Sequence, residues 1–512
     1  MYHLLNHLAI WSILPAKLLL FSDICKSLRV FLWNSLLPVE KSMLFSCICK
    51  KKSVILQRKI YDFKMLSAQD IQNFYFLGIG GIGMSALARY FKRQGYPVFG
   101  YDRTPSELTH ELEAEGIAVT YVDDPSIFNF QFSIFNSNNT LVVRTPAVPE
   151  ENRIYTYLRE QGFDIRKRAE VLGLVTRQLK ALCVAGTHGK TTTSTMIAHL
   201  LAPTNAFLGG ISLNYDTNLL VHPESEYVVV EADEYDRSFH HLSPYISVVT
   251  AVDADHLDIY GTEEAYREAF AHYTSLITGA LVMKQGIALE PRLQPGVKCY
   301  TYGMENAANI RVKDGTISFD YVSPLATIRD ISLGVPVWVN IENALAAITV
   351  ALLAGVQEEQ IKQRMASFKG VWRRFNIHVN TPRVAYVDDY AHHPQEIATA
   401  IDSVRKLYPE RKLIGVFQPH LYTRTRDFAE EFARVLHTMD ELILLPIYPA
   451  REEPIPGVTS EILGAKVVEK KDLIPHLKQL TANSQQPIVI LTVGAGDIDR
   501  LVPDIAQAIC NL

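Results

Sequence analysis

Residues 182–193 combine an apolar run with a short glycine loop, a lysine and several threonines, which suits them to binding phosphate. The run Leu182-Cys-Val-Ala185 predicts a buried strand that leads directly into the loop. Main-chain N–H groups of such a loop, and of the helix behind it, can bind phosphate oxygens, Lys190 can bridge the β- and γ-phosphates, and Thr191 can bind Mg²⁺. The alternative is a strand-to-helix turn that contains these residues by chance. The predicted ATP-binding loop is Gly186, Thr187, His188, Gly189, Lys190, Thr191 and Thr192.

Acidic residues follow two further apolar runs, at 227–232 and 246–252, which predict buried parallel strands. Ligands gather at the carboxyl ends of such strands. Mg²⁺ prefers oxygen ligands, so Glu231 together with Thr191 suits it, and His256 is a less typical third ligand. The alternatives are a structural role for His256 and, for Glu234 and Asp258, a charge that faces solvent.

Composition limits the partners of the chain. The 512 residues correspond to about three domains, and the net charge of −5 with a pI near 6.4 gives no field that favours nucleic acid. We expect a small anionic substrate and no nucleic acid. The six cysteines form no disulfide framework and indicate a reducing compartment, and Cys47-Ile-Cys49 has no second pair to complete a metal site.

Residues 1–65 differ from the rest of the chain. Their apolar stretch, residues 8–21, is broken by Pro15 and Lys17 and is too short for a membrane span. No small-residue cleavage site follows it. We therefore expect an N-terminal extension outside the functional enzyme, with Met65 as the start, and no stable membrane insertion. A weak membrane-surface anchor is the alternative.

The remaining chain predicts three doubly wound α/β domains at 66–167, 168–376 and 377–512. In the first, a strand at 73–77 precedes a glycine turn and a helix, and a second strand ends at Asp102, where a Rossmann-like fold places its ribose-binding acid. The glycines could instead serve close helix–strand packing. In the second, Asn340 and Asn343 begin a helix and can either contact a base or cap the helix. The third has strands near 384–387, 413–417, 441–445 and 488–493.

Several motifs, in order, resemble those of the Mur ligase family over residues 66–512. They are Gly78-Ile-Gly-Gly-Ile-Gly-Met-Ser85, Gly186-Thr-His-Gly-Lys-Thr-Thr192, Glu231-Ala-Asp-Glu234, Asp255-His256, Arg373-Arg-Phe375, Asp388-Asp-Tyr-Ala-His-His-Pro394 and Gly494-Ala-Gly496. The resemblance implies a Rossmann-like UDP-binding domain, a P-loop ATPase domain and a Rossmann-like C-terminal domain that binds an amino acid.

The resemblance also implies a reaction. The lactyl carboxylate of UDP-N-acetylmuramate attacks the γ-phosphate of ATP, and the amine of L-alanine then attacks the acyl phosphate, in cytoplasmic peptidoglycan precursor synthesis. The implied catalytic residues are Lys190, Glu231, His256, His392 and Arg424, and Thr191, Glu231 and His256 are implied to bind Mg²⁺. Asn340, Asn343, Arg374 and Asp389 are implied to contact ATP, and His392 and Arg424 to hold the alanine carboxylate. The implied UDP-sugar residues are Gly78, Gly80, Gly81, Gly83, Met84, Ser85 and Asp102.

Three positions depart from the family pattern. Leu421 stands where the family usually has arginine, so Arg424 or Arg426 would have to replace that charge. Val339 and Ala251 stand where a histidine and an asparagine are common. The Leu421 departure bears on the binding of the amino acid, whereas the phosphate loop that would bind ATP matches the family pattern.

Three other functions were compared with the sequence. A murein peptide ligase, which couples a preformed peptide to the same sugar, is the alternative that Leu421 keeps open. A regulatory nucleotide-binding protein conflicts with the complete set Lys190, Glu231 and His256, and an NAD oxidoreductase leaves the phosphate loop unexplained. We expect a cytoplasmic monomer or weak homodimer.

Overall fold

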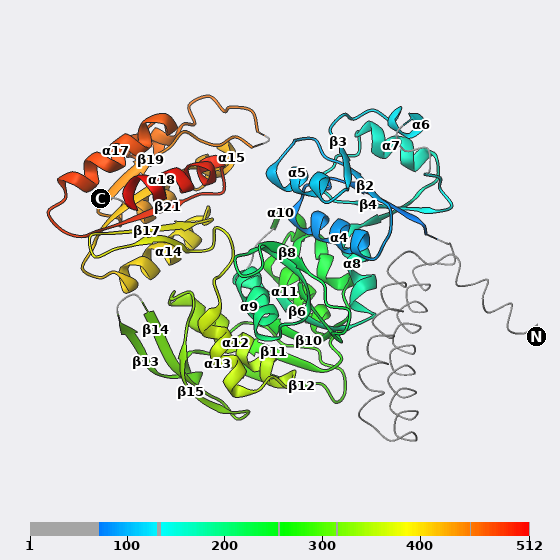
Figure 1. Cartoon of the computed structure of the whole chain (residues 1–512), viewed down its shortest axis with the longest axis horizontal. Helices are drawn as coiled ribbons and strands as arrows, with labels where there is room; N and C mark the ends of the chain where they lie inside the picture. The colour runs from blue at the N-terminus through cyan, green and yellow to red at the C-terminus, as the bar shows by residue number, and fades with distance from the viewer. Residues whose placement is uncertain (1–70, 131–134, 254–256, 314–315, 451, 511–512) are drawn as a thin grey trace, which may run out of the picture. The chain divides into compact units, whose positions relative to one another are not determined.

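The computed structural model describes residues 71–130, 135–253, 257–313, 316–450 and 452–510. The expected N-terminal extension therefore lies outside the described residues. Within them, no helix is both long enough and apolar enough to cross a membrane. The described chain contains three sheets with parallel strands, as predicted, and one small antiparallel sheet (Figure 1).

The first sheet has five parallel strands in the order β3-β2-β1-β4-β5. The strands are β1 (Asn73–Leu77), β2 (Val98–Tyr101), β3 (Ala118–Thr120), β4 (Thr140–Arg144) and β5 (Asp164–Lys167). Every residue of β1 is buried, which is why its sequence is a continuous apolar run and not an alternating one. Helix α4 (Ile82–Arg93) follows β1 directly after the glycine turn.

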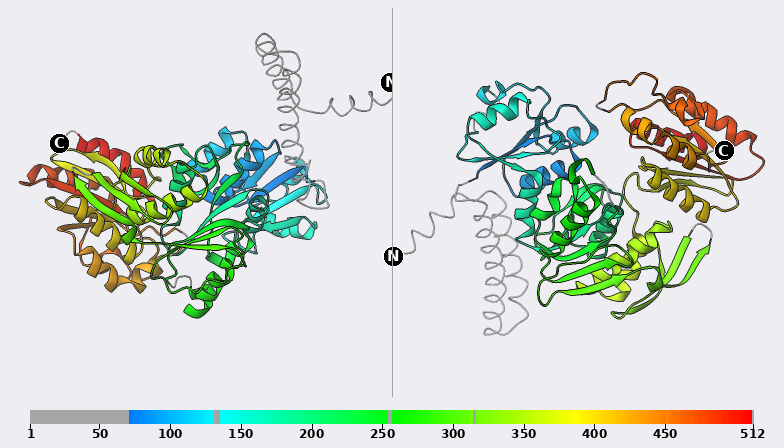
Figure 2. Two further views of the ribbon diagram at one scale, coloured as in Figure 1. Left: turned by 90° about the horizontal axis from the view of Figure 1, so that it is seen from below. Right: turned by 180° about the vertical axis from the view of Figure 1, so that it is seen from behind.

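The central sheet has seven strands in the order β12-β11-β10-β6-β9-β7-β8, and only the β8 edge is antiparallel. The strands are β6 (Lys180–Ala185), β7 (Asn205–Ser212), β8 (Thr217–Leu220), β9 (Tyr227–Glu231), β10 (Pro244–Val249), β11 (Ala280–Lys284) and β12 (Lys298–Tyr302). Strand β6 lies between β9 and β10, so the loop after it and the acidic ends of its neighbours reach the same edge. Helices cover the sheet, which is drawn in green in Figure 2. They include α9 (Lys190–Leu200), α11 (Glu263–Thr274) and α12 (Val339–Leu353).

An antiparallel sheet of β13 (Ala307–Lys313), β14 (Thr316–Val322) and β15 (Thr327–Ser332) was not predicted. Ile317, Phe319 and Tyr321 alternate along β14 and are buried in the core that also contains α12 and α13 (Glu358–Ser367). This alternation is typical of a sheet with one face on the core and the other in solvent.

The C-terminal sheet has six strands in the order β16-β17-β21-β18-β19-β20, with β16 antiparallel to β17. The strands are β16 (Asn376–Asn380), β17 (Val384–Asp389), β18 (Lys412–Phe417), β19 (Glu441–Leu444), β20 (Lys466–Val467) and β21 (Ile488–Val493). Along β17, Ala385 and Val387 belong to the core with α14 (Pro394–Leu407) and α16 (Ala429–Leu436), whereas Val384 and Tyr386 belong to the core with α17 (Lys470–Asn483) and α18 (Val502–Cys510). Both faces are therefore covered. The boundaries at 167/168 and 376/377 stay predictions; β16 begins one residue before the second.

Candidate active site

The phosphate loop joins β6 to α9 through two glycines with positive φ, Gly186 (130°) and Gly189 (80°). A Cβ at Gly186 would lie 2.2 Å from the Thr250 Oγ1, so only glycine fits against this neighbour. No side chain caps the N-terminus of α9. The free N–H groups of its first turn therefore remain available for an anion, as the sequence predicted for a phosphate loop.

Lys190 begins α9, and its ammonium lies in a largely buried ion pair. Its Nζ donates to the Gly186 carbonyl oxygen and to Glu234 Oε1, both at 2.8 Å. The side chains are 15% and 2% exposed. Desolvation lowers the pKa of Lys190, but the Glu234 and Glu231 carboxylates outweigh it and raise the pKa. Lys190 is therefore held as the charged ammonium.

The interpretation of Glu234 as a solvent-facing charge is wrong, because its side chain is buried against Lys190. Sequence reasoning placed Glu234 in an acidic turn but missed this contact. The only signal was its place three residues after Glu231, at the edge of the sheet where Lys190 also lies. Lys190 therefore has a counter-ion before any phosphate binds.

Glu231 ends β9, and its Oε2 is buried without a hydrogen bond from any described residue. A Cβ at Gly209 would lie 2.0 Å from this oxygen, so the glycine makes room for the carboxylate. Burial raises the pKa of Glu231 above its usual value, although Lys190 and Thr191 lower it. A buried carboxylate oxygen without a partner beside a threonine hydroxyl fits a hard cation such as Mg²⁺.

His256, the third predicted metal ligand, lies outside the described residues, as does Asp255; nothing is described of the Asp258 side chain. Among the described residues there is no cluster of three or more histidine, cysteine or acidic side chains that could hold a metal. Of the predicted set, Thr191 and Glu231 are thus the pair that the structure brings together.

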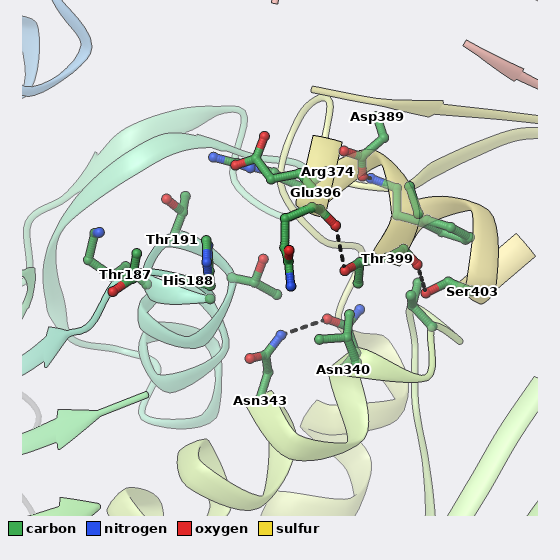
Figure 3. A pocket seen from close by; sticks show the side chains of 18 of the residues that line it. Thr187, His188, Thr191, Asn340, Asn343, Arg374, Asp389, Glu396, Thr399 and Ser403 are labelled. Carbon is green, nitrogen blue, oxygen red and sulfur yellow. Dashed lines mark hydrogen bonds between the residues drawn. The ribbon is translucent and has the colours of Figure 1, made fainter. Parts of the chain in front are cut away.

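A cavity of about 470 Å³ lies between the phosphate loop and the C-terminal sheet (Figure 3). It brings together most of the residues predicted to contact ATP. Those that line it are Thr187, His188, Gly189, Lys190, Thr191, Thr192, Asn340, Asn343, Arg374 and Asp389, and the predicted metal ligand Glu231 also lines it. Residues that sequence reasoning missed also line it, among them Gln395, Glu396, Thr399 and Ser403 on α14.

Asn340 and Asn343 lie in the first turns of α12, and neither caps the helix. Asn343 Nδ2 donates to Asn340 Oδ1 at 3.0 Å, and Thr193 Oγ1 donates to Asn343 Oδ1 at 3.2 Å. These bonds fix the amide orientations and join α12 to α9. The structure therefore excludes the capping alternative and leaves both amides on the cavity wall.

Arg374 and Asp389 reach the cavity from the C-terminal part of the chain. Asp389 accepts hydrogen bonds from the main-chain N–H groups of Phe375 (2.8 Å) and Ala391 (2.7 Å). Burial raises the pKa of Asp389 to about 6, against the lowering effect of Arg374 and of the bond from Ala391. Asp389 is thus held where β17 ends, and the Arg374 guanidinium lies 5.4 Å from the centroid of the Tyr390 ring.

His392 and Arg424 lie together at the same edge of the C-terminal sheet. Arg424 Nη1 is buried and has no hydrogen-bond partner among the described residues. Burial lowers the pKa of His392, and Arg424 adds to this against the effect of Glu396. Arg426 is half exposed and pairs with Asp427 at 2.7 Å. Of the two arginines that could replace the one absent at Leu421, Arg424 is therefore the one with a free buried nitrogen.

In the first sheet, Gly78 (φ 84°), Gly80 and Gly81 form the turn after β1. The Gly80 N–H donates to Asp102 Oδ2 at 2.7 Å, so Asp102 holds the glycine turn itself. Met84 and Ser85 are buried in α4, and Ser85 Oγ accepts from Asn218 of β8 at 3.0 Å. Gly83 packs against the Arg168 side chain. The turn is present, and the UDP-sugar role of these residues stays a prediction.

The three parallel-stranded sheets, the phosphate loop and the shared cavity agree with family comparisons that together span residues 73–496. Family models match residues 73–180 (Mur ligase family, catalytic domain), 184–351 (Mur ligase middle domain) and 373–496 (Mur ligase, glutamate ligase domain). The chain belongs to the Mur ligase family. Members of this family are ATP-dependent ligases that form amide bonds.

Individual members of the family are similar to this chain over most of its length. The chain is 55% identical over 453 residues to UDP-N-acetylmuramate–L-alanine ligase of Phocaeicola vulgatus, covering 86% of this chain and 98% of that protein. It is 50% identical over 457 residues to the enzyme of the same name from Porphyromonas gingivalis, covering 86% and 99%. The solved UDP-N-acetylmuramate–alanine ligase of Thermotoga maritima has a TM-score of 0.68 at 27% identity, covering 85% and 98%. A murein peptide ligase of Psychrobacter arcticus, at 21% identity and a TM-score of 0.59 over 86% and 99%, shares the fold.

Proposed function

We propose that this chain is an ATP-dependent ligase that joins L-alanine to UDP-N-acetylmuramate through an acyl phosphate. The observation that carries the proposal is the cavity at which the phosphate loop, Glu231 and Arg374 meet. It occurs in a chain 55% identical to a ligase named for this reaction. Similarity to the murein peptide ligase at 21% identity supports only a common fold, so alanine is favoured over a preformed peptide.

In the first step, a carboxylate oxygen of the sugar attacks the γ-phosphorus of ATP, and the bond from that phosphorus to the ADP oxygen breaks. Lys190 and the free N–H groups of α9 lie where they would neutralise charge on the transferring phosphoryl group. Arg374 adds a positive charge from the C-terminal side of the cavity. Thr191 and Glu231 would hold Mg²⁺, which when bound supplies further charge neutralisation.

In the second step, the alanine amine attacks the acyl carbon, and inorganic phosphate leaves with the oxygen that came from the sugar carboxylate. The His392 Nδ1 lies 3.1 Å from the Tyr390 carbonyl oxygen and 3.4 Å from Glu396 Oε2, so in the neutral ring this nitrogen carries the proton. The Nε2 atom is then an acceptor. The resemblance implied that both His392 and Arg424 hold the alanine carboxylate. We assign only Arg424 to the carboxylate, and we assign His392 to the alanine ammonium, from which it takes a proton.

The sugar nucleotide is proposed to bind at the glycine turn of the first sheet, with its carboxylate directed toward the phosphate loop. Both substrates with phosphates, ATP and a UDP-sugar, are metabolites of the cytoplasm, so we propose a cytoplasmic location. Residues 66–167, 168–376 and 377–512 are proposed to bind the sugar nucleotide, ATP and alanine respectively.

The test is an assay of phosphate release with UDP-N-acetylmuramate, ATP and Mg²⁺, and with L-alanine, L-serine, glycine or a tripeptide as the amine. We expect the highest kcat/KM with L-alanine. Sugar labelled with ¹⁸O in its carboxylate should transfer one labelled oxygen to the released phosphate. Activity with the tripeptide alone would reject the proposed amine, and unlabelled phosphate would reject the acyl phosphate.

A further inference from the structure

Helix α14 presents a row of polar side chains to the ATP cavity. Gln395, Thr399 and Ser403 are spaced four residues apart, so they share one face of the helix. All three line the cavity. Figure 3 shows Thr187, His188 and Thr191 at one end of this cavity and Thr399 and Ser403 at the other. A triphosphate bound at the loop would therefore direct its base toward α14.

The hydroxyl groups of Thr399 and Ser403 each donate their proton to a main-chain carbonyl oxygen of α14. Thr399 Oγ1 donates to the Gln395 carbonyl oxygen at 3.0 Å, and Ser403 Oγ donates to the Thr399 carbonyl oxygen at 2.8 Å. A hydroxyl has one proton and two lone pairs. With the proton used, each oxygen can only accept a hydrogen bond from a ligand.

The same end of the cavity has apolar walls. Val337 and Val339 line it from the side of α12, and Ala400 lines it from α14. Val337 and Ala400 are buried, and Ala400 is small enough to leave room beside the hydroxyl row. Flat apolar walls with a few fixed polar groups at one edge are typical of a site for an aromatic ring.

We propose that Thr399 and Ser403 are specificity-determining residues that select adenine by accepting hydrogen bonds from its 6-amino group. The proposal rests on the proposed use of ATP and adds the residues that distinguish its base. Guanine carries an oxygen at position 6, which would face two acceptors without a donor. Ser403 is buried, whereas Thr399 is exposed and would be covered by the bound base. A polar atom left unpaired under the base would disfavour guanine.

The test compares ATP with purine riboside triphosphate, which lacks the 6-amino group, and with GTP. Thr399→Val and Ser403→Ala each remove the oxygen with little change in shape. In the double variant we expect KM for ATP to rise about tenfold, with KM for purine riboside triphosphate unchanged. The preference for ATP over purine riboside triphosphate should then fall about tenfold. An unchanged preference in a variant that turns over would overturn the proposal.

Thr481→Val is the matched control. Thr481 Oγ1 donates to the Leu477 carbonyl oxygen at 2.8 Å, the same bond on a helix of the same sheet, but it does not line the cavity. Its preference for ATP should equal that of the wild type. If the wild-type enzyme releases no phosphate from ATP with sugar and alanine, the proposed function fails. If it does so and the double variant keeps its preference, only the role of α14 fails.

Discussion

The Glu234 carboxylate forms an ion pair with the Lys190 ammonium. We expect the substitution Glu234→Gln to tighten ATP binding. The carboxylate and an incoming γ-phosphate both need the same ammonium. Glutamine keeps an oxygen that can accept from Lys190 but removes the negative charge. The free enzyme then loses a buried ion pair, and the bound enzyme loses a repulsion between two anions; both changes favour the bound state.

The size of the effect follows from the geometry around Nζ. Glu234 Oε1 lies 2.8 Å from it. A phosphate oxygen at a similar distance would be at most about 5.6 Å from Oε1, and two unit charges at that separation repel by about 3 kcal/mol at an effective dielectric constant of about 20. Lys190 offsets part of this repulsion because it touches both anions. We therefore expect Kd to fall about tenfold, with about a hundredfold as the upper limit.

The assay is isothermal titration of ATP at pH 8 without the sugar, so that no turnover occurs. Glu226→Gln is the control, because Glu226 forms a 2.8 Å pair with Lys180 that is exposed on both sides. Exposed pairs contribute little, so Kd should not change there. Weaker binding of ATP to Glu234→Gln than to the wild type would refute the reasoning, since it would mean that Glu234 stabilises the nucleotide-bound state.

Three further outcomes are expected. Lys190→Ala should lower kcat roughly 10²–10³-fold while Kd for UDP-N-acetylmuramate, measured by titration, stays the same; loss of sugar binding would contradict separate sites. Arg424→Lys should raise KM for alanine roughly 10- to 100-fold without changing KM for ATP, because the free Nη1 is lost; equal changes in both would argue against a carboxylate contact. The pKa of Asp389 in the folded protein is raised to about 6. The protonated carboxyl therefore contributes fully to stability when the pH is below the pKa of Asp389 in the unfolded chain, and this contribution is lost as the pH rises through 6. Asp389→Asn should therefore gain in Tm relative to the wild type between pH 4 and pH 7, and a constant difference would show that the carboxyl titrates normally.

The parallel sheets were predictable because strands buried on both faces are continuous apolar runs. β1, β9 and β21 each stand out as such a run, and each was predicted. Sheet β13–β15 was missed because its strands alternate polar and apolar residues over only 6 to 7 positions. The strands that were predicted are continuous apolar runs, so this alternation, which is the pattern of a half-buried strand, was missed.

The site was predictable where chemistry requires particular residues in sequence, as in Gly186–Thr192. It was less predictable where a side chain acts from another element. In the sequence, nothing distinguishes Glu234 from the acidic residues near it. Its contact with Lys190 depends on β9 lying beside β6. Thr399 and Ser403 read as ordinary polar positions on a helix. Their position on the cavity wall depends on how α14 follows the turn at 388–393, which no local pattern gives.

Residues 370–375 connect the sheet that carries the phosphate loop to the C-terminal sheet, and Arg374 lies in this connection. On one side, Val371 forms a bridge with Ser212, and the Trp372 N–H donates to the Ile211 carbonyl oxygen at 2.8 Å, so these residues pair with the end of β7. On the other side, Arg373 is buried, with its Nη2 2.7 Å from the Gly494 carbonyl oxygen and its Nε 3.2 Å from Asp388.

The chain thus passes from one sheet to the other between residues 372 and 373. Arg373 takes a φ of 59°, which an L-residue keeps only where its contacts impose it. Arg374 is the next residue and lines the cavity. Its N–H donates to the Val371 carbonyl oxygen at 3.1 Å, and its guanidinium lies 5.4 Å from the centroid of the Tyr390 ring, in the turn after β17. A phosphate that binds both Lys190 and Arg374 would therefore contact side chains from both sides of this connection.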